Sequence, residues 1–312
     1  MEKRKLQSRL ASLGLPLALA VLVAALSLAR PSFLNLANLV NLVRQISING
    51  ILAVGVTYVL LTGGVDLSLG SVVALSGVAA ASLAHPGEYP AVVPVAGGIL
   101  AGAACGAANG LVVARGKVAP FIVTLGMMTA ARGMALLMSG GRPVSNLTAG
   151  FMQIGGGNIA GVPEPILIFF LVALLSRVLL ANMRFGRYVY AVGGNENAAL
   201  ASGVPVRSVK MGAYTLCGAL AGLAGVVLAS RITTGQPNAG IGYELDAIAA
   251  VVIGGTSLNG GVGGVGGTIL GALLMGVINN GLDLLNVSSY YQQVVKGVII
   301  VGAVWLDRSK DR

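Results

Sequence analysis

Charge is scarce in this chain, and so are aromatic residues, histidine and cysteine. Only 10% of the 312 residues are charged, whereas a soluble domain carries about 25%. A water-facing surface needs more charge than this, so the hydrophobic residues, 55% of the chain, must face lipid or one another. The composition argues against a soluble globular enzyme and indicates an integral membrane protein.

The rare reactive residues give little support to a metal, redox or catalytic site. His85 is the single histidine and lies in a His-Pro-Gly-Glu turn. Cys105 and Cys217 lie in apolar segments of small residues, so we interpret them as packing residues and not as a disulfide or a metal pair. We expect no metal and no enzymatic activity in this chain.

The sequence also gives no support to a nucleotide-binding site. No G-x-x-x-x-G-K-[ST] segment occurs, so ATP cannot bind through a P-loop here, and any coupling to ATP must come from a partner. The stretch Gly261–Gly266 matches G-x-G-x-x-G, but an uncharged apolar run surrounds it in place of a βαβ unit. Helix-packing glycines are the better interpretation.

The charges that are present predict a topology. Lys and Arg number 20 against 10 Asp and Glu, and they gather at the amino terminus, at 114–118, at 183–209 and at the carboxyl terminus. Short basic loops are retained in the cytoplasm. No basic stretch is interleaved with aromatic residues, so we expect no nucleic-acid partner.

Apolar segments and polar breaks alternate along the chain, which predicts an all-α protein with about ten transmembrane helices, some of them interrupted. With ten spans all four basic clusters fall on the cytoplasmic side, together with both termini. The first span is long enough to be a retained helix and not a signal peptide. We treat 1–312 as a single transmembrane domain with spans near 11–29, 45–63, 67–85, 90–113, 119–139, 164–182, 210–230, 245–258, 262–283 and 291–306.

Glycine is abundant, with 47 residues, and small residues let helix backbones approach closely in lipid. Two glycine-rich stretches, 61–70 and 252–261, resemble each other, and each lies between apolar runs. Transporters built from repeats often carry interrupted helices at corresponding positions. Two similar turns arising by chance is the alternative.

Polar residues inside apolar segments are costly and need an explanation. Asp66, Arg132 and Asp246 are expected along a polar pathway or in pairs across helices, although Asp66 is better explained as the cap of the helix that follows Gly63-Gly64. Four asparagines offer neutral hydrogen bonds to a hydroxylated solute, or simply join helices. The possible pathway residues are therefore Asn49, Asp66, Asn109, Asn279 and Asn280.

The 183–209 loop carries its own helix signal. Asn195 is a good N-cap, the stretch from Glu196 to Ser202 favours a helix, and Gly203 with Pro205 ends it. Small side chains on a short cytoplasmic helix suit docking into a groove of another protein. A plain connector is the alternative.

Five motifs together resemble the permease subunits of bacterial ATP-binding cassette importers, in the branch that carries ribose, xylose, arabinose and related monosaccharides. The resemblance covers nearly the whole chain. The motifs are Leu-Thr-Gly-Gly-Val-Asp-Leu-Ser-Leu-Gly-Ser at 61–71, Val-Ala-Pro-Phe-Ile-Val-Thr-Leu-Gly-Met at 118–127, Arg-Phe-Gly-Arg at 184–187, Gly-Gly-Asn-Glu-Asn-Ala-Ala at 193–199 and Val-Ile-Gly-Gly-Thr-Ser-Leu-Asn-Gly-Gly at 252–261.

The resemblance implies a multi-pass protein of the bacterial inner membrane, a second permease copy in a homodimer, a cytoplasmic ATPase and a periplasmic sugar-binding protein. It implies that ATP and Mg²⁺ bind to partner subunits. It also implies that the 183–209 loop holds the helix that rests on the ATPase, a role that falls on Gly194, Asn195, Ala198, Ala199 and Gly203.

One position departs from the family pattern, because Asn197 stands where a second acidic residue often follows. We expect this difference to change the detailed contacts of the helix and not its role. We expect an arginine at Ala199 to uncouple uptake from ATP hydrolysis while the protein still inserts.

Two alternatives stay open at this point. Permeases for branched-chain amino acids or nucleosides share the general plan, although an amino acid's charged ends call for complementary charges that are sparse here. A passive channel or facilitator without an ATPase is the alternative from a different class.

Overall fold

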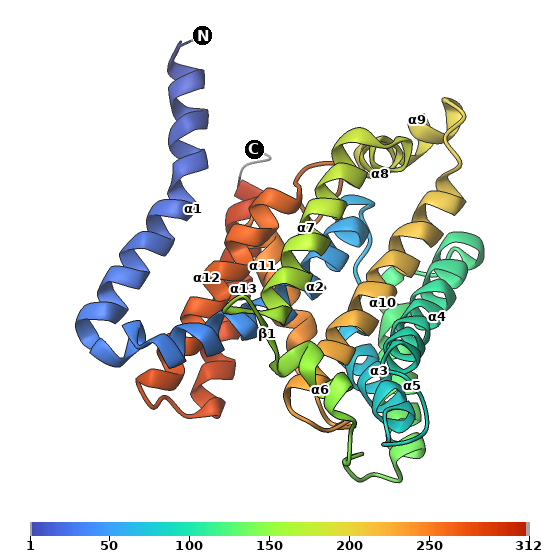
Figure 1. Ribbon diagram of the computed structural model, residues 1–312. Helices are drawn as coiled ribbons and strands as arrows, with labels where there is room; N and C mark the ends of the chain where they lie inside the picture. Colours follow the sequence, from blue (N-terminus) through green and yellow to red (C-terminus); the bar gives the residue numbers. More distant parts are fainter. Residues whose placement is uncertain (1, 310–312) are drawn as a thin grey trace.

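The computed structural model describes the backbone of residues 2–309 and the side chains of residues 14–302 and Trp305. Within these residues the chain is almost entirely helical, as predicted (Figure 1). The elements are α1 (Glu2–Ala29), a 3-10 helix (Pro31–Leu34), α2 (Leu36–Leu61), α3 (Leu69–Leu83), α4 (Val92–Gly116), α5 (Pro120–Ser139), α6 (Ala149–Gly156), β1 (Asn158–Ile159), β2 (Val162–Pro163), α7 (Glu164–Asn182), α8 (Arg184–Gly194), α9 (Glu196–Ala201), α10 (Val206–Arg231), α11 (Tyr243–Ile253), α12 (Val265–Leu284) and α13 (Ser289–Ser309).

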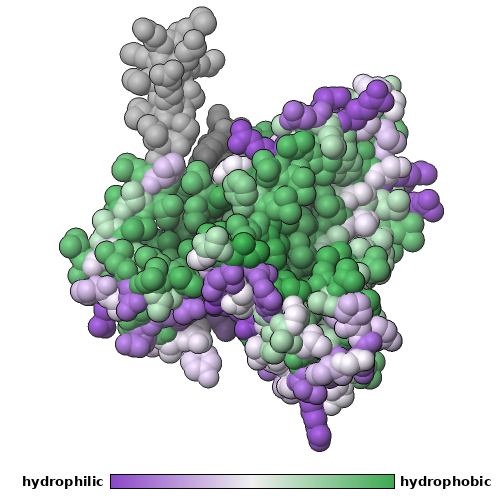
Figure 2. Space-filling model, in the orientation of Figure 1, coloured by the Kyte–Doolittle hydropathy of each residue, from purple (hydrophilic) through white to green (hydrophobic). Residues whose placement is uncertain are grey.

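An apolar belt crosses the face of the molecule that Figure 2 shows. Figure 2 shows hydrophobic surface across its middle, with hydrophilic residues gathered over α8 and α9 on one side and over the loops on the opposite side. Exposed leucine, isoleucine, valine and phenylalanine side chains on α5 and α7 contribute to the belt. A surface of this kind is stable only against lipid or another apolar protein surface.

Each of the ten predicted spans contains a helix, but the helices differ in length. Among the described residues, α2, α4, α5, α7, α10 and α12 are long and apolar enough to cross a membrane. The apolar parts of α1 and α3 are shorter, and α11 has 11 residues. The structure therefore supports a membrane protein with six full-length candidate spans, while ten crossings and the side of the termini stay predictions.

Glycines bring α4 and α10 into direct backbone contact. A Cβ atom at Gly102 would overlap the carbonyl oxygen of Gly218, and a Cβ atom at Gly218 would overlap that of Gly102. One turn away, a Cβ at Gly222 would lie 2.7 Å from the carbonyl oxygen of Gly98. Glycine at intervals of four residues lines one face of a helix, so the contact follows directly from the sequence spacing.

Two loops interrupt helices on the side of α8 and α9. The first break, residues 62–68, separates α2 from α3, and the second break, residues 254–264, separates α11 from α12. The two similar glycine-rich stretches thus occupy equivalent helix–loop–helix positions. The backbone amide of Gly261 donates to the carbonyl oxygen of Leu61, the last residue of α2, at 3.0 Å. A Cβ atom at Gly260 would lie 2.8 Å from the amide nitrogen of Gly63, so the two breaks also touch each other.

The predicted 245–258 span is too long for the helix that is present. Helix α11 ends at Ile253, and Gly255 follows with a φ of 90°, a left-handed conformation that glycine adopts without strain. The chain then stays irregular until Val265. An interruption is present in the 252–261 stretch, and the helix ends five residues before the predicted end of the span.

Candidate functional site

The predicted cytoplasmic helix is present as α9. The side chain of Asn195 accepts a hydrogen bond from the backbone amide of Ala198 at 2.9 Å, which is the predicted N-cap. The helix ends one residue earlier than predicted, and Gly203 follows with a φ of 81°. Glu196 forms an ion pair of 2.6 Å with Lys210, which ties α9 to α10.

The two faces of α9 differ. Ala198 and Leu200 are exposed, Leu200 at 63% of its surface, whereas Ala199 is only 5% exposed and packs in a cluster with Val206 and Val209 of α10. An arginine at Ala199 would therefore disrupt the packing of α9 against α10 of the same chain. Ala199→Arg is therefore a poor test of coupling, because it would change the packing of α9 and not only its docking on another protein.

A cavity of about 510 Å³ lies beside α9. The loop between α4 and α5, which includes the basic Lys117, lines this cavity together with α9 and the start of α10. Its lining includes both apolar and charged side chains, namely Val113, Ala114, Lys117, Val118, Ala119, Pro120, Glu196, Asn197, Leu200, Val206, Arg207 and Lys210. The exposed face of α9 is thus one wall of a wider concave surface.

Two of the predicted pathway residues meet in the first break. Asp66 is buried, and its Oδ1 accepts from the backbone amide and from the hydroxyl of Ser68 at 2.9 and 2.6 Å. Asn109 of α4 donates to the Ser68 hydroxyl at 3.1 Å. Asp66 therefore lies before α3 as predicted, but Ser68 and not Asp66 is its N-cap residue. The carboxylate closes an Asx-type turn instead.

A second polar group surrounds Asp246. Lys296 of α13 pairs with Asp246 Oδ2 at 2.8 Å, and Asn279 of α12 donates to the same oxygen at 3.3 Å. Asp246 is 3% exposed. A charge inside an apolar segment is costly, and here the ion pair with a neighbouring helix offsets that cost. Pairing across helices was one of the two predicted arrangements.

The remaining predicted polar residues form no hydrogen bond with these two groups among the described residues. Asn280 exchanges two hydrogen bonds with Asn38, of 2.8 and 3.1 Å, so it joins α12 to α2. Asn49 is buried in α2, and its Oδ1 has no hydrogen-bond partner among the described residues. Arg132 is satisfied by backbone, because its guanidinium donates to the carbonyl oxygens of Pro237 and Ala239. The five pathway candidates therefore do not belong to a single hydrogen-bonded group.

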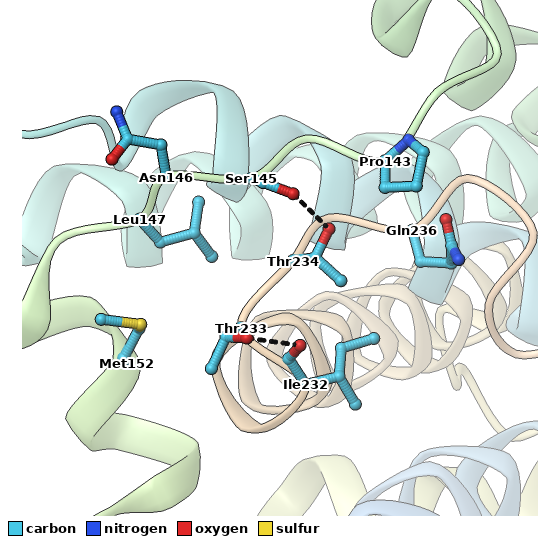
Figure 3. A pocket seen from close by; sticks show the side chains of 9 residues that line it. All are labelled: Pro143, Ser145, Asn146, Leu147, Met152, Ile232, Thr233, Thr234 and Gln236. Carbon is cyan, nitrogen blue, oxygen red and sulfur yellow. Dashed lines mark hydrogen bonds between the residues drawn. The ribbon is translucent and has the colours of Figure 1, made fainter.

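The opposite side of the molecule has its own pocket, of about 560 Å³ (Figure 3). Val144 and Gly235 exchange backbone hydrogen bonds of 2.9 and 2.8 Å, which hold the loop after α5 against the loop after α10. Ser145, Asn146 and Thr234 line the pocket from these two loops. The 140–163 segment, which includes α6 and the β1–β2 hairpin, therefore forms a structured surface on this side.

Sequence reasoning missed three residues of these groups. Ser68 lies between Asp66 and Asn109 in the first group, and Lys296 pairs with Asp246 in the second. The hydroxyl of Tyr190 in α8 donates to the carbonyl oxygen of Gly263 at 2.9 Å. A lone lysine in the apolar 291–306 run was the available signal for Lys296. Nothing in the sequence around Tyr190 indicates its distant partner.

Comparison with known proteins identifies the family and several relatives of this chain. Residues 38–304 match the family described as branched-chain amino acid transport system / permease component. The chain is 48% identical to the ribose import permease protein RbsC of Escherichia coli (strain K12), over 94% of this chain and 92% of that protein. It is 49% identical to RbsC of Bacillus subtilis (strain 168), over 96% and 93%.

A further relative, the D-allose transport system permease protein AlsC of Escherichia coli (strain K12), is 40% identical over 93% of this chain and 89% of its own length. No solved structure matches the chain. The family match spans far more than half of the chain, and the resemblance drawn from its motifs is confirmed. The chain therefore belongs to the family of permease components of the branched-chain amino acid transport system type.

Proposed function

We propose that this chain is the permease subunit of an ATP-binding cassette importer for a monosaccharide, with ribose as the first candidate. The observation that carries the proposal is the identity of 48% and 49% to two ribose permeases over more than nine-tenths of each chain. The chain has no P-loop, so hydrolysis belongs to separate subunits and the chain itself is not an enzyme. Its setting is the bacterial inner membrane, which it crosses several times.

The solute class follows from the relatives and from the charge pattern. RbsC and AlsC are permeases for ribose and D-allose by name, whereas the family description names branched-chain amino acids. In this chain the two buried acidic residues of the interior, Asp66 and Asp246, are already bonded within the protein. Neither of these two carboxylates is therefore left without a partner for the ammonium end of an amino acid.

Helix α9 is the contact for the ATPase in this proposal. It is exposed on one face, fixed on the other by Ala199, and capped at its start by Asn195. With Gly194, Ala198 and Gly203 it forms a rigid projection beside the cavity that Leu200 lines. A rigid projection transmits displacement better than a flexible loop, because little of the movement is lost in bending.

The side that carries α9 is cytoplasmic in this proposal, and the opposite side faces the periplasm. The polar pocket of Figure 3 then lies on the face that receives a sugar-loaded binding protein. A second permease copy completes the membrane part, with the solute pathway between the two copies. The apolar belt leaves room for both lipid and this second copy (Figure 2).

Uptake by cells that lack this subunit tests the proposal. Labelled ribose, allose, arabinose and leucine are supplied separately, with and without the restored subunit. Restoration of uptake for a sugar alone is expected, and restoration for leucine alone would replace the proposed solute class. Uptake that persists after removal of the ATPase would instead indicate a passive facilitator.

A further inference from the structure

Helix α8 lies in contact with both helix breaks. At its end, a Cβ atom on Gly193 would overlap the carbonyl oxygen of Leu61 and the amide nitrogen of Gly261. These two groups are hydrogen-bonded to each other at 3.0 Å. Gly193 therefore lies directly against the point where the first break meets the second, and only glycine fits there.

A second contact joins α8 to the second break one turn earlier. The hydroxyl of Tyr190 donates to the carbonyl oxygen of Gly263 at 2.9 Å. Burial raises the pKa of the Tyr190 phenol, so the group stays a protonated donor at physiological pH. A directional hydrogen bond and a backbone contact together fix both the position and the rotation of α8 on the breaks.

A linker of one residue joins the same helix to α9. Helix α8 ends at Gly194 and α9 begins at Glu196, so Asn195 alone separates them. Val189 and Val192 of α8 are buried in the same cluster as Ala199 of α9. Figure 1 shows α8 and α9 following each other along one side of the molecule.

The first break in turn reaches the helix bundle. Asp66 and Ser68 of that break are hydrogen-bonded to each other, and Asn109 joins them to α4. The second break continues directly into α12 at Val265. A movement of the junction would therefore be felt by α3 and α4 on one side and by α12 on the other.

We propose that α8 passes the displacement of α9 to both helix breaks at once, with Tyr190 and Gly193 as the positioning residues of this connection. The inference rests on the proposed function of α9 as the ATPase contact. Because Gly261 and Leu61 are bonded to each other, the two breaks move together and not in succession. The connection acts through α8 and needs no contact of Tyr190 or Gly193 with the solute.

Two substitutions with matched controls test the connection. Gly193→Ala places a methyl group into the junction, whereas Gly266→Ala adds the same methyl at the start of α12 where nothing lies within 4 Å. Tyr190→Phe removes one hydroxyl and its hydrogen bond, whereas Tyr188→Phe removes a hydroxyl of α8 for which no hydrogen bond is present in the structure. All four variants are made in the complete importer.

The measurement is the amount of labelled ribose taken up per ATP hydrolysed, in liposomes that contain the permease and its ATPase and receive loaded binding protein. We expect Gly193→Ala to lower this ratio about tenfold and Tyr190→Phe about threefold, while basal hydrolysis and assembly with the ATPase persist. The two controls keep the wild-type ratio. A purely structural role would lower the yield of assembled complex and leave the ratio per assembled complex unchanged.

Each outcome decides a separate point. If Gly193→Ala does not assemble, the smaller change Tyr190→Phe carries the decision, and a wild-type ratio there overturns the connection. If the wild-type complex transports but both test variants keep its ratio, the connection is wrong and the proposed function stands. If the wild-type complex shows no ATP-dependent uptake of any sugar, the proposed function fails, and the inference built on it fails too.

Discussion

The Asp246–Lys296 pair gives a quantitative test of how this chain carries charge inside an apolar bundle. Lys296→Met removes the cation and keeps an apolar chain of similar length. The carboxylate then retains only the 3.3 Å hydrogen bond from Asn279, and Asp246 stays 3% exposed. The variant measures the cost of leaving that carboxylate without its counter-charge.

The expected magnitude follows from the geometry. At 2.8 Å and an effective dielectric constant of about 20, the attraction of the pair is about 6 kcal/mol, and desolvation offsets most of it. Removal of one partner from a buried pair costs about 3–5 kcal/mol. Lys296 keeps 26% side-chain exposure, so we take about 3 kcal/mol, which is roughly a hundredfold in the ratio of folded to unfolded protein.

Thermal melting of the detergent-solubilised protein, followed by size-exclusion chromatography, measures the effect. The double variant Asp246→Asn/Lys296→Met removes both charges and should recover all but about 1 kcal/mol of the loss. Lys210→Met is the control, because its pair with the exposed Glu196 is worth less than about 1 kcal/mol. The reasoning is refuted if Lys296→Met melts like the wild type, or if the double variant is as unstable as the sum of its parts.

Three other substitutions follow from contacts described above. Asn195→Ala removes the N-cap of α9 at a cost of about 1 kcal/mol and should weaken ATPase binding in a titrated pull-down, whereas Asn195→Asp retains it. Gly102→Val should abolish the folded peak in chromatography because α10 leaves no space, whereas Gly126→Val, with open space, should not. Asn280→Leu leaves the half-buried Asn38 side chain with only its bond to the carbonyl oxygen of Phe33 and should lower stability by about 1–3 kcal/mol. Adding Asn38→Leu should restore part of this loss, since it removes the orphaned oxygen but also the Phe33 bond; stability unchanged by the single variant would contradict this.

Local signals in the sequence predicted the helices well. The ranges 164–182 and 262–283 correspond to α7 and to α12 at Val265–Leu284, because each is a long apolar run that starts after a Pro or a Gly and ends where polar residues follow. The end of α11 was misplaced, because the predicted span was carried through Gly254-Gly255 to residue 258. Composition does not distinguish a glycine that packs from a glycine that turns.

The candidate site was predictable where it depends on neighbouring residues. Asn195 accepts from an amide three residues later, so sequence alone was sufficient for the cap. The burial of Ala199 depends on Val206 and Val209 across the turn, and an alanine carries no mark of which way it faces. Lys296 and Asp246 are 50 positions apart, and only the packing of α11 against α13 brings them together.

The glycine contact between α4 and α10 differs in kind from these side-chain contacts. At an ordinary contact, a residue that grows on one helix can be accommodated by a smaller residue on the other. Gly102 faces Gly218, and neither has a side chain from which atoms can be removed. A larger residue at one of these glycines therefore cannot be compensated by a substitution at the other. Asp246 and Lys296, in contrast, can be replaced together.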